Sequence, residues 1–161
     1  FDHVVIAAHS DEALAMLADP SEEERSILSA VGYRPNAVYL HRDPRLMPKR
    51  REAWAAWNFL RESDRSEGDV CVSYSMQHLQ GIDPKRPLFV TLDPPQPPRD
   101  DLVFGVYNYS HPQYDAAAFA AQKRLRAVNG QNRTWFAGAW TGYGFHEDGL
   151  VSGMAAAEGL G

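Results

Sequence analysis

Residues 134–158, TWFAGAWTGYGFHEDGLVSGMAAAE, are the stretch that decides how this chain is expected to fold. A short apolar run ending at Gly138 predicts a buried strand over 134–138. A turn rich in glycine follows, and small residues then predict a helix over about 148–160. The unpaired amides and positive dipole end of that helix would point into the turn. The stretch therefore predicts half of a nucleotide-cofactor site, or else a plain strand-turn-helix packing unit.

The glycine fingerprint that normally opens a dinucleotide site is missing. Such a site begins with Gly-x-Gly-x-x-Gly between a strand and a helix, with an acidic residue about 20 positions later. Gly142 and Gly144 lack a third glycine at that spacing, and the chain begins at Phe1 in strand-like sequence. We therefore expect this chain to be the C-terminal portion of a larger protein.

The N-terminal residues predict a second buried strand. Residues 3–8 form a continuous apolar run that is too short for a helix and is typical of a fully buried parallel strand. Ser10 then predicts the N-cap of a helix reaching Leu17, and Ser21 with Glu24 predicts a capping box for a helix reaching about Val31.

The central residues change to a period of two. Strands are predicted over 37–41, 53–61, 70–77, 88–92 and 103–109, with a charged turn over 62–68 and a proline-rich linker over 94–98. Within 70–77 the apolar side chains share one face while Cys71, Ser73 and Ser75 share the other. An antiparallel sheet with one polar side is expected, followed by a helix that Asp115 caps.

Four stretches resemble a known family. Residues 134–158 resemble the C-terminal FAD motif of the flavin-containing amine oxidase and phytoene desaturase superfamily. Residues 46–58 (LMPKRREAWAAWN), 74–80 (YSMQHLQ) and 109–114 (YSHPQY) narrow the resemblance to bacterial predicted NAD/FAD-binding amine oxidoreductases. The resemblance covers nearly the whole chain.

The resemblance and the strand patterns together imply an α/β fold with an α+β insertion. A partial FAD/NAD(P)-binding Rossmann-like lobe would have parallel strands at both ends of the sequence, with an antiparallel substrate-domain sheet inserted between them. The expected boundaries are 1–33 for the returning strand and helices of the FAD-binding domain, 34–112 for the substrate-domain sheet, and 113–161 for the C-terminal helix-strand-helix.

FAD is the cofactor that the resemblance implies. The residues expected to contact it are Ala7, Ala8, Gly138, Ala139, Trp140, Tyr143, His146, Asp148, Gly149 and Leu150. Amides around Gly149 and Leu150 would favour the anionic reduced flavin. Many relatives carry an acidic residue after the Ala-Gly pair, where this chain has Ala139.

Several of these side chains have a second interpretation. Glu147 and Asp148 fit helix capping better than an acid pair, because a carboxylate would oppose charge on the reduced flavin. His146 either contacts cofactor or substrate or is a hydrogen-bonded scaffold residue. Trp140 and Tyr143 either wall the flavin pocket or take part in ordinary aromatic packing. No catalytic residue can be assigned, since the flavin performs the electron transfer in such enzymes.

The expected function is hydride transfer from an amine or apolar substrate to flavin, as the C-terminal portion of an FAD-dependent oxidoreductase. The chain alone is expected to bind FAD weakly or not at all, because its partner, the N-terminal FAD-binding half, is missing. The alternative is a non-catalytic binding module for a small apolar ligand or a protein partner. Unpaired strand edges also suggest a homodimer.

Composition excludes several other classes. The 161 residues include 16 basic and 21 acidic side chains, a net charge of −5 that argues against nucleic-acid binding. Cys71 is the single cysteine, which excludes an internal disulfide or a cysteine-based zinc site and fits a cytoplasmic protein. The histidines lack metal-binding spacing, no apolar run nears the roughly 20 residues of a membrane span, and no Gly-x-Ser-x-Gly supports a serine hydrolase.

Overall fold

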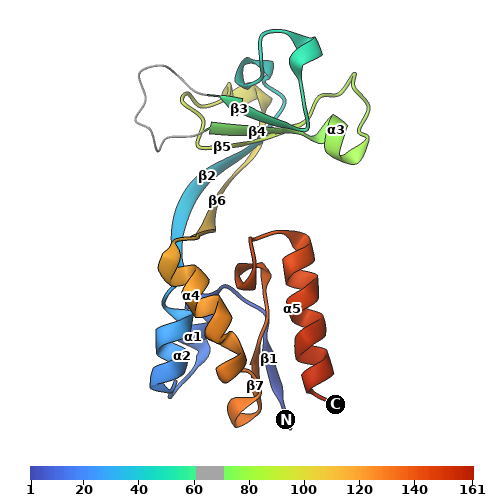
Figure 1. The fold of residues 1–161 in the computed structure, drawn as a ribbon. Helices are drawn as coiled ribbons and strands as arrows, with labels where there is room; N and C mark the ends of the chain where they lie inside the picture. The colour runs from blue at the N-terminus through green and yellow to red at the C-terminus, as the bar shows by residue number, and fades with distance from the viewer. Residues whose placement is uncertain (61–70) are drawn as a thin grey trace. The chain divides into compact units, whose positions relative to one another are not determined.

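The computed structural model describes residues 1–60 and 71–161, and the charged turn predicted over 62–68 lies outside them. The chain divides into two compact units, one made of Phe1–Arg34 with His111–Gly161 and the other of Pro35–Ser110 (Figure 1). The boundaries fall within two long strands, β2 (Gly32–His41) and β6 (Val103–Gln113).

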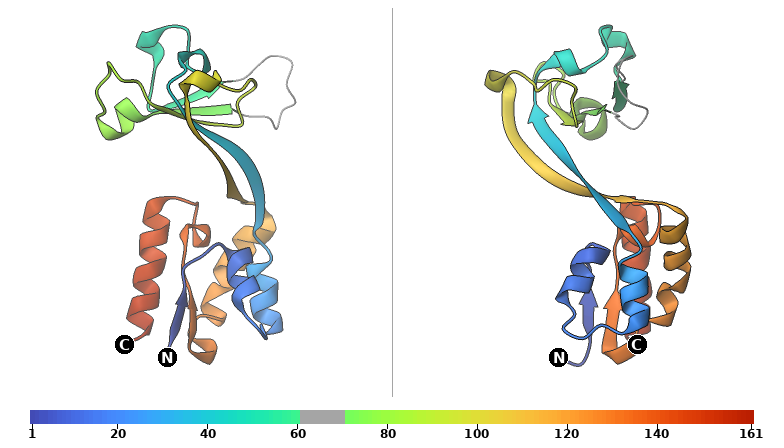
Figure 2. Two further views of the ribbon diagram at one scale, coloured as in Figure 1. Left: turned by 180° about the vertical axis from the view of Figure 1, so that it is seen from behind. Right: turned by 90° about the vertical axis from the view of Figure 1, so that its left-hand side faces the viewer.

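The first unit is built on a parallel pair of strands from opposite ends of the sequence. β1 (Val4–Ile6) pairs with β7 (Thr134–Phe136), Val4 opposite Thr134 and Ile6 opposite Phe136. Helices α1 (Ser10–Met16), α2 (Glu22–Leu28) and α4 (Ala116–Arg124) lie on one side of this pair, and α5 (His146–Gly159) lies on the other (Figures 1 and 2). The predicted parallel pairing of the two terminal strands is confirmed.

The helix starts follow local capping chemistry. In α2, Ser21 Oγ accepts the Glu24 N–H at 3.2 Å and Glu24 Oε2 accepts the Ser21 N–H at 2.7 Å, which confirms the capping box. Asp115 caps α4 by accepting the Ala118 N–H at 2.8 Å. In α1 the prediction was wrong by one residue, because Ser10 is the first helical residue and its buried N–H donates to the Tyr33 hydroxyl at 2.8 Å.

The core of this unit lies between β7 and the helices α1, α2 and α4. Its largest fully buried side chains are Phe136, Ile27 and Leu28. β1 differs from its prediction here, because Val4 and Val5 are 47% and 44% exposed instead of fully buried. β7 is the partner of β1 among the described strands, so the other edge of β1 has no described neighbour.

The second unit contains a five-stranded sheet in the order β3-β4-β5-β2-β6. β3 (Trp57–Leu60), β4 (Cys71–Ser75) and β5 (Phe89–Leu92) pair antiparallel with one another, and β5 pairs antiparallel with β2. Together with the parallel pair β1 and β7, this confirms the predicted mixed α/β fold class.

Two central strands are shorter than predicted. The strand expected over 53–61 begins only at Trp57, because Arg51–Ala53 form a 3-10 turn. The strand expected over 70–77 ends at Ser75, where α3 (Met76–Gln80) begins, and Gly81 closes this helix in the left-handed conformation at φ 65°.

The polar side of the central sheet is the buried side. Cys71, Ser73 and Ser75 are 1% exposed or less, whereas Val72 and Tyr74 of the same strand are half-buried. Thr91 Oγ1 bonds Ser73 Oγ and His41 Nε2, each at 2.7 Å. The period-two pattern located the polar face of the sheet. The structure shows that the hydroxyl groups on this buried face are hydrogen-bonded to neighbouring side chains.

Candidate functional site

The loops after the two parallel strands meet and are tied together by hydrogen bonds. The Ala137 N–H donates to the Ile6 carbonyl at 3.1 Å, extending the pairing beyond β7. Trp140 Nε1 donates to the Ala8 carbonyl at 3.0 Å. The Gly138 N–H donates to Ser152 Oγ of α5 at 2.9 Å. Ala8 and Gly138 are thereby brought to one end of the parallel pair, as two of the predicted site residues.

Gly138 is required by the packing of this corner. Its φ of 151° disfavours L side chains, and an added Cβ would lie 2.8 Å from the Trp140 ring and 3.3 Å from the Ala8 carbonyl oxygen. Gly149 lies close to Ala139, because a Cβ added at Gly149 would be at ordinary van der Waals distance, 3.7 Å, from the Ala139 nitrogen. The start of α5 therefore packs directly on the turn.

The aromatic side chains of the turn are divided between core and surface. Trp140 is 2% exposed and belongs to the hydrophobic core, so its placement agrees with aromatic packing and not with an open pocket wall. Tyr143 is 70% exposed, with its ring 5.9 Å from that of Phe119. Ala7, His146 and Leu150 are also exposed.

The helix N-terminus lies two residues earlier than predicted, at His146. The Asp148 carboxylate is the reason, since its Oδ2 accepts the N–H groups of Tyr143 at 3.0 Å and Phe145 at 2.9 Å and so fixes the entry to the helix. The interpretation of Asp148 as a capping residue agrees with these bonds.

This earlier start changes which amides are available to a ligand. The Gly149 N–H donates to the Phe145 carbonyl at 3.2 Å, so it is not an open donor as the sequence had suggested. Among the described residues, no acceptor lies within hydrogen-bond range of the His146 and Glu147 N–H groups. The first-turn amides of α5 are thus supplied by His146 and Glu147, ahead of Gly149 and Leu150.

Three residues outside the predicted set of cofactor contacts complete the turn. Gln122 of α4 donates through Nε2 to the carbonyls of Trp140 at 2.8 Å and Gly142 at 2.7 Å. Ser152 and Gln122 also line a cavity of about 290 Å³ beside the turn. The Tyr114 hydroxyl is buried without a partner among the described residues and lies against Gly144. These contacts join distant parts of the sequence, and only the position of Tyr114 in 109–114, one of the family-like stretches, gave any signal.

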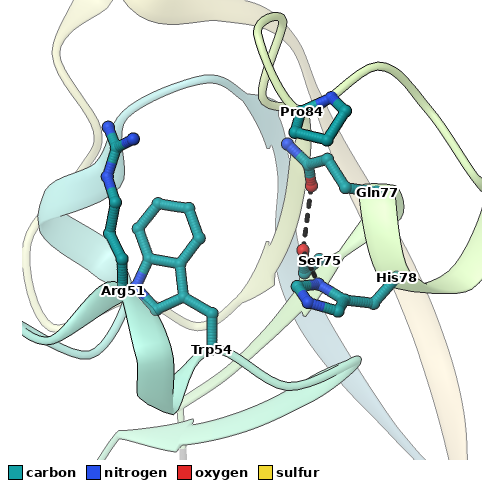
Figure 3. A pocket seen from close by; sticks show the side chains of 6 residues that line it. All are labelled: Arg51, Trp54, Ser75, Gln77, His78 and Pro84. Atoms are coloured by element: carbon teal, nitrogen blue, oxygen red, sulfur yellow. Dashed lines mark hydrogen bonds between the residues drawn. The ribbon is translucent and has the colours of Figure 1, made fainter.

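A second cavity of about 300 Å³ lies wholly within the second unit (Figure 3). It is lined by Arg51, Trp54, Ser75, Gln77, His78 and Pro84. All but Pro84 come from the family-like stretches 46–58 and 74–80. Among the described residues, no group of three or more His, Cys, Asp or Glu side chains could hold a metal ion.

No protein-family model and no curated protein matches this chain. Among solved structures, the chain is similar to the CLA-producing fatty acid isomerase from P. acnes, with a TM-score of 0.58 and 16% sequence identity. The match covers 98% of this chain and 41% of the isomerase, so the chain spans less than half the length of that protein. The two share a fold. None of the described helices is long and apolar enough to cross a membrane.

Proposed function

We propose that this chain is the C-terminal portion of an FAD-dependent oxidoreductase, similar to amine oxidases, that moves hydride from an amine or apolar substrate to flavin. The observation that carries the proposal is the parallel pairing of β1 with β7. It brings the loop at Ala8 to the loop at Gly138, beside the first turn of α5. Bound FAD would supply the redox chemistry.

The residues at this turn fit an anionic cofactor. The free N–H groups of His146 and Glu147 and the positive end of the α5 dipole favour negative charge next to them. The Asp148 carboxylate is held by two amide donors of the turn. The orphaned Tyr114 hydroxyl marks a buried place where a polar partner is missing.

The proposed partner is an N-terminal half that carries the glycine-rich fingerprint on a further parallel strand. The edge of β1 away from β7 has no described neighbour, and parallel sheets are normally buried on both faces. Leu150, Val151 and Met154 of α5 are each more than half exposed, as expected of a surface that the missing half covers. A longer protein also agrees with the 41% of the isomerase that this chain spans. We place the complete protein in the cytoplasm as part of this proposal.

The first test compares this chain with a longer product of the same reading frame. A Gly-x-Gly-x-x-Gly segment should be encoded upstream of Phe1, and the longer protein should retain FAD through gel filtration while this chain loses it. Retention of yellow colour by the present chain would refute the need for the missing half. Absence of flavin from a longer protein that carries the fingerprint would refute the cofactor assignment.

A pair of substitutions at His146 tests the amide contact in the longer protein. His146→Pro deletes one free N–H at the first helical position, where proline is tolerated, and Phe145 before it is already extended at ψ 160°. His146→Ala removes the imidazole and keeps the amide. We expect weaker FAD binding only in the proline variant. Equal weakening in both variants would assign the contact to the imidazole instead.

A second candidate function is a non-catalytic binding module for a small apolar ligand or a protein partner. The cavity in Figure 3 favours it, because this cavity is formed entirely by the second unit and uses no residue of the glycine turn. Failure of the longer protein to bind flavin, together with ligand binding in this cavity, would favour the module.

A homodimer across the open β1 edge is a third proposal, which light scattering tests.

A further inference from the structure

The cavity in Figure 3 has an apolar wall whose polar atoms are already used. Trp54 Nε1 donates to the Pro48 carbonyl at 2.8 Å, so the indole offers the cavity only its carbon surface. The ring packs edge-on against the buried Phe89, with centroids 5.4 Å apart at 85°, which fixes its orientation. Pro84 adds a second apolar surface to the same cavity.

Three hydrogen-bonded side chains form the polar part of the lining. The Gln77 amide is assigned with its oxygen accepting the Leu88 N–H at 2.7 Å, because this orientation also lets its nitrogen donate to Leu88 O and, at 2.8 Å, to Ser75 Oγ. Since Ser75 Oγ accepts that bond, its own proton goes to His78 Nδ1, which lies 2.8 Å away (Figure 3). His78 therefore carries its proton on Nε2, as a donor.

Ser75 itself is not a nucleophile for a bound molecule. The residue is 0% exposed, and its hydroxyl proton and lone pair are committed to His78 and Gln77. The contact of a serine with an imidazole here sets the tautomer of His78. The lining therefore offers no free serine nucleophile to a molecule in the cavity.

Arg51 supplies the charge of the cavity. Its guanidinium lies over the Trp54 ring, with Cζ 5.4 Å from the centroid, and no carboxylate among the described residues pairs with it. The free polar groups of the lining, Arg51 and His78 Nε2–H, are thus donors, whereas the amide oxygen of Gln77 is taken by Leu88.

We propose that this cavity binds a small carboxylate whose apolar body lies against Trp54 and Pro84 and whose head is held by Arg51. Guanidinium is suited to bidentate carboxylate binding, and a volume of about 300 Å³ is at the lower end of ligand pockets. An ammonium head would meet a cation and find no free acceptor. The proposal is independent of flavin binding, because the cavity and the glycine turn belong to different units.

Three probes with one apolar body test the proposal on the unmodified chain. 3-Phenylpropanoate, 3-phenylpropanol and 3-phenylpropylamine are titrated while the ¹⁵N–¹H indole signal of Trp54, assigned with Trp54→Phe, is followed by NMR. The carboxylate should shift this signal and bind at least about tenfold more tightly than the alcohol, because hydrogen bonds to charged groups are the stronger ones. The amine should bind most weakly, and inorganic phosphate should not shift the signal, because it has no apolar body.

Arg51→Gln and Arg50→Gln form a matched pair of variants. Both remove one positive charge from neighbouring residues, but only Arg51 lines the cavity. We expect Arg51→Gln to weaken carboxylate binding at least about tenfold and Arg50→Gln to leave it unchanged. Equal losses of affinity in the two variants would overturn the proposal. So would an affinity for the alcohol or the amine that equals or exceeds that for the carboxylate. A shift of the Trp54 signal caused by phosphate, or no shift with the carboxylate, would also overturn it. The three-probe comparison does not use Arg51→Gln, so it decides the matter even if that variant fails to fold.

Discussion

Lowering the pH should destabilise the second unit through His41. The imidazole is fully buried, and burial lowers its pKa from 6.5 to about 4, against a smaller opposing effect of the Asp43 charge. Its Nδ1 accepts the Asp43 N–H at 3.1 Å and its Nε2 lies 2.7 Å from Thr91 Oγ1, so the neutral ring carries its proton on Nε2 and donates it to Thr91. Protonation would place a second proton on Nδ1, which would then face the Asp43 N–H and lose that hydrogen bond.

The direction and size of this loss of stability follow from proton linkage. Between pH 6.5 and about 4 the unfolded chain binds the proton and the folded chain does not, so acid favours unfolding in this window. The whole difference between the two pKa values corresponds to roughly 3 kcal/mol, and we expect about 2 kcal/mol of it to be lost between about pH 7 and about pH 4.5. Asp43 acts at lower pH, because its hydrogen bonds to Arg45 hold the pKa of its carboxyl well below the usual range.

Urea unfolding followed by tryptophan fluorescence across this pH range measures the loss, and NMR titration of the His41 ring measures the pKa directly. His41→Gln keeps a side-chain donor but cannot titrate, so its unfolding free energy should change less with pH than that of the parent chain. His3→Gln, which changes an exposed residue, should keep the parent slope. A parent chain equally stable at both pH values, or a His41→Gln variant with the parent slope, would refute the reasoning.

Three further substitutions test the turn and the buried polar face. Gly138→Ala should lower the unfolding free energy of the chain by about 2 kcal/mol or more in urea unfolding, because of backbone strain and the contact with the Trp140 ring. Gly153→Ala is the control: its added Cβ meets no atom within 4 Å, so it should be neutral or stabilising in the same assay. Asp148→Ala should cost about 1 kcal/mol and speed hydrogen exchange of the two amides that its carboxylate accepts, with Glu147→Ala as the control that leaves exchange unchanged. Thr91→Val should cost about 1–3 kcal/mol by unpairing two buried side chains, and a stability equal to the parent in the same urea assay would contradict the role of the buried hydroxyl chain.

Local patterns predicted the elements well where the physical cause is local. The capping box at Ser21, the cap at Asp115 and the alternation in β4 each depend on residues a few positions apart, and the structure contains all three. The start of α5 was placed at about residue 148, where the run of small residues begins. The Asp148 carboxylate instead reaches back to Phe145, which moves the start to His146.

The candidate site was predictable only in part, because many of its contacts join residues that are far apart in the sequence. The convergence of Ala8 with Gly138 followed from predicting two parallel strands, and the structure confirms their pairing. The hydrogen bonds from Gln122 to the turn and the burial of Trp140 depend on how α4 packs, which no local pattern records. The same limit applies to the cavity at Arg51, whose lining comes from three separate segments.

The exposure of β1 bears on the proposed additional strand. An apolar run over 3–8 is typical of a strand covered on both faces, yet Val4 and Val5 are nearly half exposed. A sequence is selected for the surroundings of its residues in the whole protein, whereas the exposed fractions are those of this chain alone. Covering these two side chains needs further structure against the β1 side of the pair, since β7 already occupies the other edge. The difference between pattern and exposure therefore supports the proposed additional strand, and it accounts for the edge and the apolar surface of α5 with a single missing neighbour.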